Sequence, residues 1–123
     1  MSRILIADDH REVRNQIRSF LVAFSGWEIC GEAANGRDAV LKAAQLRPDL
    51  VILDVGMPMM DGVQAAREIG RLLRGVPILL FTVTDSPDLQ RVAKEAGVQQ
   101  VIVKSEGLMA LANAISAHVT QRP

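Results

Sequence analysis

Residues 50–53, with the sequence Leu-Val-Ile-Leu, form an uninterrupted apolar run that ends in one carboxylate, Asp54. Such a run predicts a strand buried on both faces, as in a parallel sheet covered by helices. Gly56, Pro58 and Gly62 follow closely, so we expect the chain to leave this strand in a turn-rich loop. Asp54 then lies at the carboxyl end of the strand, the edge at which open α/β sheets bind ligands. A lone Asp at such a place more often caps the loop or the next helix, so the rest of the chain decides its role.

Strand-like and helix-like patterns alternate five times along the chain. The strand patterns cover residues 4–7, 27–33, 50–53, 76–81 and 98–103. Apolar residues at helical spacing follow each strand, at residues 13–24, 39–46, 63–73, 89–96 and 108–119, and residues 121–123 are expected to fray. This alternation predicts an α/β protein with a parallel sheet and helices on both faces. The most economical topology is a flavodoxin-like, doubly wound (βα)5 fold with strand order 2-1-3-4-5.

Length and charge exclude several classes of function. The 123 residues fit one domain, and 14 basic residues balance 14 acidic ones. This balance gives no electrostatic case for binding nucleic acid or an anionic membrane, and aromatic residues for base stacking are scarce. The single Cys30 excludes an internal disulfide and suits a reducing compartment. There is no signal-peptide pattern, and no apolar run approaches the roughly 20 residues of a membrane span, so a cytoplasmic protein is expected.

Polar residues follow four of the five predicted strands. They are Asp8 and Asp9 after the first strand, Asp54 after the third, Thr82 after the fourth and Lys104 after the fifth. In the predicted order the first and third strands are neighbours, so Asp8, Asp9 and Asp54 come together. Three carboxylates this close repel one another at neutral pH and require a cation. An oxygen-rich site suits Mg²⁺, or alternatively Mn²⁺, better than zinc.

The same residues suit phosphoryl transfer. A divalent cation would attract a phosphate group, Lys104 could contact a phosphoryl oxygen as a point charge, and Thr82 could donate a hydrogen bond to another. Asp54 is the candidate nucleophile, because carboxylates form aspartyl-phosphate intermediates. Taken singly, each residue has a simpler explanation as a helix cap, a strand-end hydroxyl or a solvated lysine. The required residue types at four strand ends together favour the functional interpretation.

The sequence resembles the receiver domain of bacterial two-component response regulators over essentially its whole length. The resemblance is carried by residues 4–10, residues 50–54, the pairs Met57-Pro58 and Asp61-Gly62, Thr82 and the pair Val103-Lys104. It implies that Asp54 accepts a phosphoryl group from a phosphohistidine of a sensor histidine kinase. It also implies that Asp9, Asp54 and the backbone carbonyl of Gly56 bind Mg²⁺ directly, while Asp8 assists through water. Thr82 and Lys104 are implied to contact the phosphoryl group.

The resemblance further implies a signalling module and not an enzyme with a separate substrate, since such a domain catalyses only its own phosphoryl transfer and dephosphorylation. Residues 7–10, 31–36 and 104–105 look most like receivers joined to a C-terminal helix-turn-helix DNA-binding domain. The implied output is transcription regulation, and the implied partners include a second copy of the chain after phosphorylation. We expect residues 1–123 to form the receiver domain, with no output domain among them. Either the chain is a single-domain receiver or it is the receiver part of a longer regulator. The missing output domain favours the second alternative.

Three residues depart from the family pattern. Val83 replaces a small residue after Thr82, and could crowd the site or simply point away. Val101 replaces a common aromatic residue, so an aromatic rotamer switch is impossible there. Ser105 replaces a common Pro, which leaves the isomer of the bond before it open. These departures keep open a pseudo-receiver that binds partners without being phosphorylated.

Other interpretations rest on weaker features. A metal-dependent phosphohydrolase would favour a D-x-D spacing and a substrate-covering insertion, and neither is present. Cofactor oxidoreduction would need a G-x-G-x-x-G motif after the first strand, which is also absent. His10 is expected at the surface and not as a metal ligand. Arg11, Arg14 and Arg18 are expected to form a solvated helix face that could contact a kinase.

Overall fold

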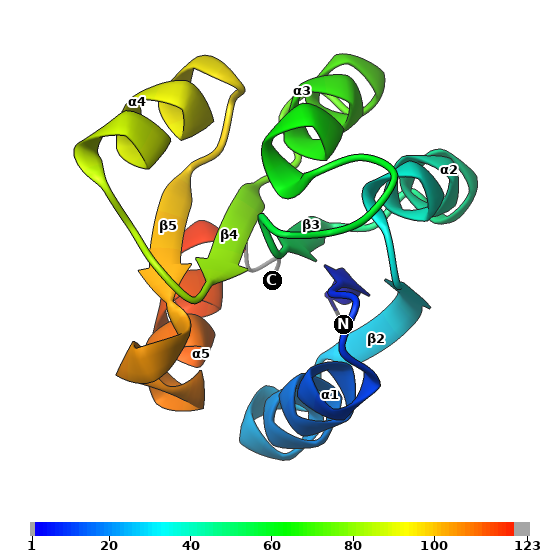
Figure 1. Ribbon diagram of the computed structural model, residues 1–123. Coiled ribbons are helices and arrows are strands. Elements are labelled where there is room, and N and C mark those ends of the chain that lie inside the picture. The colour runs from blue at the N-terminus through cyan, green and yellow to red at the C-terminus, as the bar shows by residue number, and fades with distance from the viewer. Residues whose placement is uncertain (1, 120–123) are drawn as a thin grey trace.

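One parallel sheet forms from the apolar runs, with strands in the order β2-β1-β3-β4-β5 (Figure 1). The computed structural model describes residues 2–119, and the expected fraying of residues 121–123 lies outside this range. The strands are β1 (Arg3–Ala7), β2 (Glu28–Ala33), β3 (Leu50–Leu53), β4 (Ile78–Thr82) and β5 (Gln100–Val103). Each neighbouring pair is parallel, so the predicted class and strand order are confirmed.

β4 and β5 begin later than the apolar patterns that predicted them. The Val76 N–H donates to the Leu73 carbonyl (3.2 Å), and the Val98 N–H donates to the Ala93 carbonyl (2.9 Å). Both valines therefore complete the turn that ends a helix. Pro77 has no N–H to donate to a ladder. These apolar residues just before a strand thus belong to the end of the preceding helix. Hydropathy alone does not distinguish them from residues of the strand.

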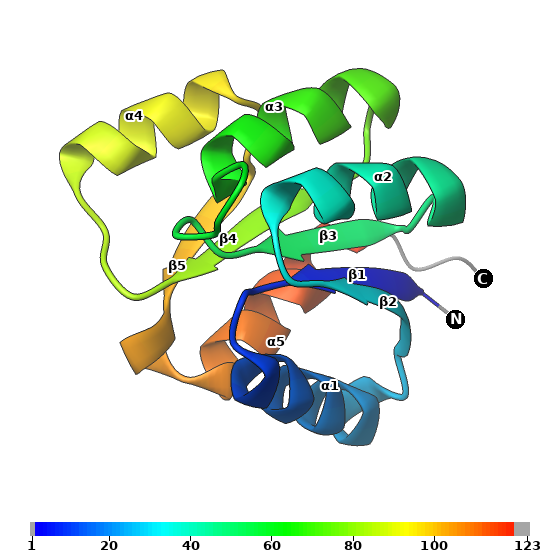
Figure 2. The same ribbon diagram turned by 45° about the vertical axis from the view of Figure 1, so that its right-hand side comes forward.

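Two layers of helices enclose the sheet. The helices are α1 (Arg11–Ser25), α2 (Gly36–Leu46), α3 (Gly62–Leu72), α4 (Pro87–Glu95) and α5 (Leu108–His118), with a short 3-10 helix, η1 (Lys104–Glu106), before α5. Figure 2 shows α2, α3 and α4 on one face of the sheet and α1 and α5 on the other. The side chains of Asn35, Asp61 and Ser86 cap the first turns of α2, α3 and α4, which explains where these helices begin.

The sheet has an apolar core on each face. Leu5 and Val51 point into the core beneath α2, α3 and α4, whereas Ile6 and Ile52 point into the core beneath α1 and α5. All four side chains are fully buried, as expected of central parallel strands. The carboxyl ends of β1 and β3 are therefore fixed from both sides. No helix within residues 2–119 combines the length and apolar character needed to cross a membrane.

Candidate functional site

Two buried carboxylates lie side by side at the carboxyl edge of the sheet. Asp8 directly follows β1 and Asp54 directly follows β3, and both are buried. The Asp8 N–H donates to the Ala33 carbonyl (3.0 Å), and the Asp54 N–H donates to the Ala7 carbonyl (2.9 Å). These bonds continue the sheet ladder beyond the strands. The N–H group of each acid is consequently held by a neighbouring strand.

Asp9 and His10 complete the acidic cluster. One carboxylate oxygen from each of Asp8, Asp9 and Asp54 and one ring nitrogen of His10 all lie within 4.8 Å of one another. The His10 ring is largely exposed, as expected, but its Nδ1 lies 3.2 Å from Asp8 Oδ1 and 3.0 Å from Asp9 Oδ1. Although it is exposed, the His10 ring therefore contacts two carboxylates of the cluster. The sequence prediction that Asp8, Asp9 and Asp54 come together is confirmed.

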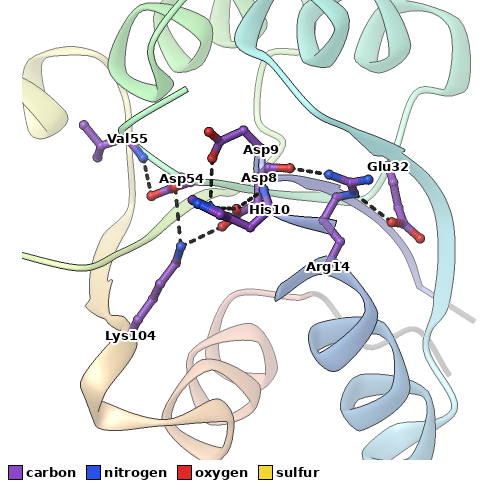
Figure 3. Close-up of polar contacts among 8 residues, drawn as sticks. All are labelled: Asp8, Asp9, His10, Arg14, Glu32, Asp54, Val55 and Lys104. Carbon is purple, nitrogen blue, oxygen red and sulfur yellow. Dashed lines mark hydrogen bonds and ion pairs between the residues drawn. The ribbon is translucent and has the colours of Figure 1, made fainter. Parts of the chain in front are cut away.

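Lys104 supplies a positive charge between the buried acids (Figure 3). Its Nζ lies 2.7 Å from Asp8 Oδ2 and 3.4 Å from Asp54 Oδ2, and its side chain is 18% exposed. Burial of the ammonium disfavours its charge, but the hydrogen bond to Asp8 and the charges of both carboxylates outweigh burial. The pKa of Lys104 is therefore raised above its ordinary value. Lys104 stays charged and acts as an internal counterion.

The two oxygens of Asp54 have different surroundings. Oδ1 accepts a hydrogen bond from the Val55 N–H (2.8 Å), whereas Oδ2 faces Lys104. The following loop packs back on the acid, because the Gly62 N–H donates to the Val55 carbonyl (2.9 Å). Gly56 lies exposed in this loop, and a Cβ built on it would meet nothing within 4 Å. Space therefore does not require glycine at position 56, and the ligand role of its carbonyl stays a prediction.

Thr82 lies buried at the end of β4, in register with Val103, which precedes Lys104. Within residues 2–119 no hydrogen bond joins its side chain to the acids or to Lys104. Val83 is 67% exposed, and its effect on the site stays a prediction. Val101 packs against the core beneath α2, α3 and α4. The peptide bond between Lys104 and Ser105 is trans.

The prediction of a solvated arginine face was wrong for one of its three members. The Arg14 side chain is only 14% exposed, and its Nε donates to Glu32 Oε1 (3.0 Å). Its Nη1 donates to the backbone carbonyl of Asp8 (2.6 Å), so α1 reaches the acidic cluster. Arg18 also pairs with Glu32 (2.9 Å) but is more exposed, and Arg11 is exposed as expected. Strand order 2-1 places Glu32 beside Ile6, and this neighbourhood was the signal that could have revealed the pair.

The donor set fits a hard divalent cation. Three carboxylates present oxygen atoms within reach of one another, and Lys104 neutralises only part of their charge. Oxygen donors of this kind suit Mg²⁺ or Mn²⁺. A cation here would lie against Asp54, whose carboxylate points toward the same space as Lys104 (Figure 3). The arrangement can therefore hold a dianion between a metal and an ammonium group.

The structure is an open five-stranded parallel sheet with acids after β1 and β3 and a lysine after β5. Residues 4–116 match the family described as the response regulator receiver domain. The chain therefore belongs to the response regulator receiver domain family. The resemblance drawn from the sequence is thereby confirmed.

Curated relatives include the response regulator protein VraR of Staphylococcus aureus. It is 37% identical over 114 residues, which cover 92% of this chain and 54% of VraR. The chain thus spans about half the length of this relative.

Several solved structures share the fold. A LuxR-family two-component response regulator from Aurantimonas sp. SI85-9A1 is 31% identical with a TM-score of 0.90, covering 95% of this chain and 84% of that one. The chemotaxis protein CheY4 of Vibrio cholerae is 30% identical with a TM-score of 0.85, covering 97% and 99%. The CheY of Borrelia burgdorferi, in a structure titled as a complex with CheX, BeF3 and Mg²⁺, is 25% identical with a TM-score of 0.86, covering 97% and 90%.

Proposed function

We propose that this chain is the phosphoacceptor module of a two-component phosphorelay, with Asp54 as the acceptor. The observation that carries the proposal is the asymmetric setting of Asp54, whose Oδ1 is held by the Val55 N–H while Oδ2 faces Lys104. A carboxylate oxygen of Asp54 attacks phosphorus of a phosphohistidine on a sensor kinase. The P–N bond breaks, its electron pair goes to the imidazole nitrogen, which takes up a proton, and an acyl phosphate forms.

The remaining groups stabilise charge and orientation. Asp9, Asp54 and the Gly56 carbonyl would hold Mg²⁺ directly, and Asp8 would do so through water. The ion supplies charge neutralisation for the transferred group. Lys104 exchanges one carboxylate partner for a phosphoryl oxygen, and the Thr82 hydroxyl donates to another. The clustered carboxylates and the Mg²⁺ named for the Borrelia CheY complex support this metal assignment.

The proposed output is transcription regulation. VraR and the LuxR-family regulator are response regulators, and this chain spans about half of VraR. A DNA-binding domain outside these residues would then make the nucleic-acid contact, since the domain itself has no net charge. The proposed partners are a sensor histidine kinase in the cytoplasm and a second copy after phosphorylation. The module catalyses only its own phosphorylation and dephosphorylation.

Phosphoramidate tests the acceptor assignment, because it is a small donor with the N–P bond of a phosphohistidine. The chain is incubated with phosphoramidate and Mg²⁺, then treated with hydroxylamine, which converts an acyl phosphate to a hydroxamate. Peptide mass spectrometry is expected to place the hydroxamate on Asp54. A hydroxamate on another acid contradicts the assignment, and steady release of phosphate from small esters would indicate a phosphohydrolase instead.

A further inference from the structure

Arg14 connects three elements near the acidic cluster without touching a carboxylate of that cluster (Figure 3). Its guanidinium extends from the first turn of α1, donates to the Asp8 carbonyl at the end of β1, and donates to Glu32 in β2. The bond to the Asp8 carbonyl is 2.6 Å long and comes from a charged donor. Charge-assisted hydrogen bonds of this kind are stronger than bonds between neutral groups. The contact therefore restrains the position of the Asp8 carbonyl oxygen.

That backbone atom helps to determine where Asp9 lies. The Asp8 N–H is still held by β2 through Ala33, but the Asp8 carbonyl belongs to the peptide that leads out of the sheet. Its orientation fixes the plane of the peptide bond between Asp8 and Asp9, because that unit is planar. Asp9 has no ladder of its own, and its side chain is 31% exposed. The His10 N–H donates to Asp8 Oδ1 (2.9 Å) and holds the far side of Asp9. The Asp8 carbonyl holds the near side, so the position of the Asp9 carboxylate depends on both contacts.

Glu32 determines the orientation of Arg14. Its Oε1 accepts from Arg14 Nε, while its Oε2 pairs with Nη1 of Arg18 one turn further along α1. The guanidinium is planar, so fixing Nε also fixes the direction of Nη1. Glu32 is shared between Arg14 and Arg18, so it offsets only part of the positive charge of Arg14.

We propose that Arg14, oriented by Glu32, is a positioning residue that sets the affinity of the acidic cluster for a divalent cation. Arg14 holds the peptide between Asp8 and Asp9 and contacts neither the ion nor the phosphoryl group. The inference rests on the proposed function, because it takes the acidic cluster as the Mg²⁺ site.

The direction in which Mg²⁺ affinity changes when Arg14 is replaced distinguishes a positioning role from a purely electrostatic one. Removing a positive charge near three carboxylates would by Coulomb interaction alone strengthen Mg²⁺ binding. Losing the hold on the Asp8 carbonyl would instead weaken it, because the Asp9 carboxylate would sample other positions. For Arg14→Met, which keeps the apolar stem, we expect Mg²⁺ affinity to fall on the order of 10-fold, as is typical when a residue that supports metal ligands is lost.

Arg18→Met is the matched control. Arg18 lies on the same helix, pairs with the same Glu32 and carries the same charge, but makes no bond to the Asp8 carbonyl. Mg²⁺ affinity is measured by titrating the metal and following backbone amide resonances around the cluster, which needs no phosphorylation. Arg18→Met is expected to bind Mg²⁺ as tightly as the unmodified chain, or slightly more tightly. Arg14→Lys retains the positive charge but has a single donor nitrogen, and its Mg²⁺ affinity is expected to fall between that of Arg14→Met and that of the unmodified chain.

A second readout uses phosphorylation by phosphoramidate at varied Mg²⁺. In Arg14→Met the Mg²⁺ concentration for half-maximal rate is expected to rise, while the rate at saturating Mg²⁺ is kept. Unchanged or tighter Mg²⁺ binding in Arg14→Met overturns the inference, as does equal weakening in Arg14→Met and Arg18→Met. If Arg14→Met does not fold, Arg14→Lys with unmodified Mg²⁺ affinity overturns it. Failure of Asp54 labelling with normal Mg²⁺ binding would count against the proposed function and not against this positioning role.

Discussion

Lys104 neutralises part of the negative charge of the site when no other cation is bound. Its Nζ contacts both Asp8 and Asp54, the two buried carboxylates. The sequence predicted Lys104 as a phosphoryl contact but did not predict its bond to Asp8. Hydropathy places a residue at a strand end, whereas the direction of a long flexible side chain depends on the field of the folded site.

Replacing Lys104 with methionine tests this role. Lys104→Met leaves two buried carboxylates facing each other without a counterion, which destabilises the folded state. We expect a loss of about 2 to 3 kcal/mol in the free energy of unfolding, somewhat less than for a fully buried pair because solvent reaches part of Lys104. The loss is measured by urea unfolding without metal. Saturating Mg²⁺ is expected to recover part of it, and an equal loss at all Mg²⁺ concentrations would contradict the counterion role.

Cys30 gives a prediction of pH dependence outside the site. Burial raises the pKa of its thiol above the ordinary value of 9.0, and nearby Arg3 only partly opposes this. The folded state therefore keeps a proton that the unfolded chain loses first. The resulting stability is complete below pH 9.0 and is lost as the pH rises through the higher pKa of the folded state.

Alkylation by iodoacetamide measures the Cys30 titration directly. The pH midpoint of the reaction rate is expected to lie above 9.0 in the folded chain and to return toward that value in urea. Cys30→Ala serves as the control for stability, and its unfolding free energy is expected to lack the decline in this pH range. A folded midpoint at or below the ordinary value would contradict the assignment.

At the scale of elements, the start of α3 packs directly on the acceptor. A Cβ built on Gly62 would lie 2.1 Å from the Asp54 carbonyl oxygen, and one on Gly36 in α2 would lie 2.0 Å from the Met60 carbonyl oxygen. Both obstacles are backbone atoms, so no rotamer change relieves them. The loop between β3 and α3 is thereby clamped between two helix starts.

Gly62→Ala tests this clamp. The added methyl forces the start of α3 away from Asp54, which is expected to cost about 1 to 3 kcal/mol in unfolding free energy and to slow phosphorylation. Gly70→Ala, in the same helix, is the matched control, because its Cβ would meet the Ala96 carbonyl oxygen at an ordinary 3.8 Å. Gly70→Ala is expected to be neutral or stabilising by up to about 1 kcal/mol. Urea unfolding and phosphoramidate labelling check both variants, and equal behaviour of the two would contradict the clamp.

The elements were predictable where one physical signal dominates. Uninterrupted apolar runs predicted β1 and β3, because central parallel strands are buried on both faces. The starts of β4 and β5 were misplaced, since Val76 and Val98 are apolar but bond to the preceding helix ends. Arg14 was misassigned because a helical wheel shows a polar face without showing that Glu32 of the neighbouring β2 lies opposite it.

At the scale of the whole molecule, the strand order brings the residues of the site together. The order 2-1-3-4-5 makes β1 and β3 neighbours, so Asp8 and Asp54 meet although 45 residues separate them. Helices on both faces bury these strands, and Asp8 and Asp54 follow them directly. This much followed from the sequence, because alternation and strand ends are encoded locally. The exact partners of each oxygen did not follow, since they depend on side chains from α1, β2 and η1 converging in three dimensions.

Intact mass after incubation with acetyl phosphate and Mg²⁺ tests the central claim most directly. The unmodified chain, the same chain without Mg²⁺ and an Asp54→Asn variant are compared, with amide spectra confirming that each is folded. The account predicts a single phosphoryl adduct on the unmodified chain that requires both Mg²⁺ and Asp54. An adduct that persists in Asp54→Asn, or no adduct on a folded chain that binds Mg²⁺, would contradict it, and the latter result would favour a receiver that acts without phosphorylation.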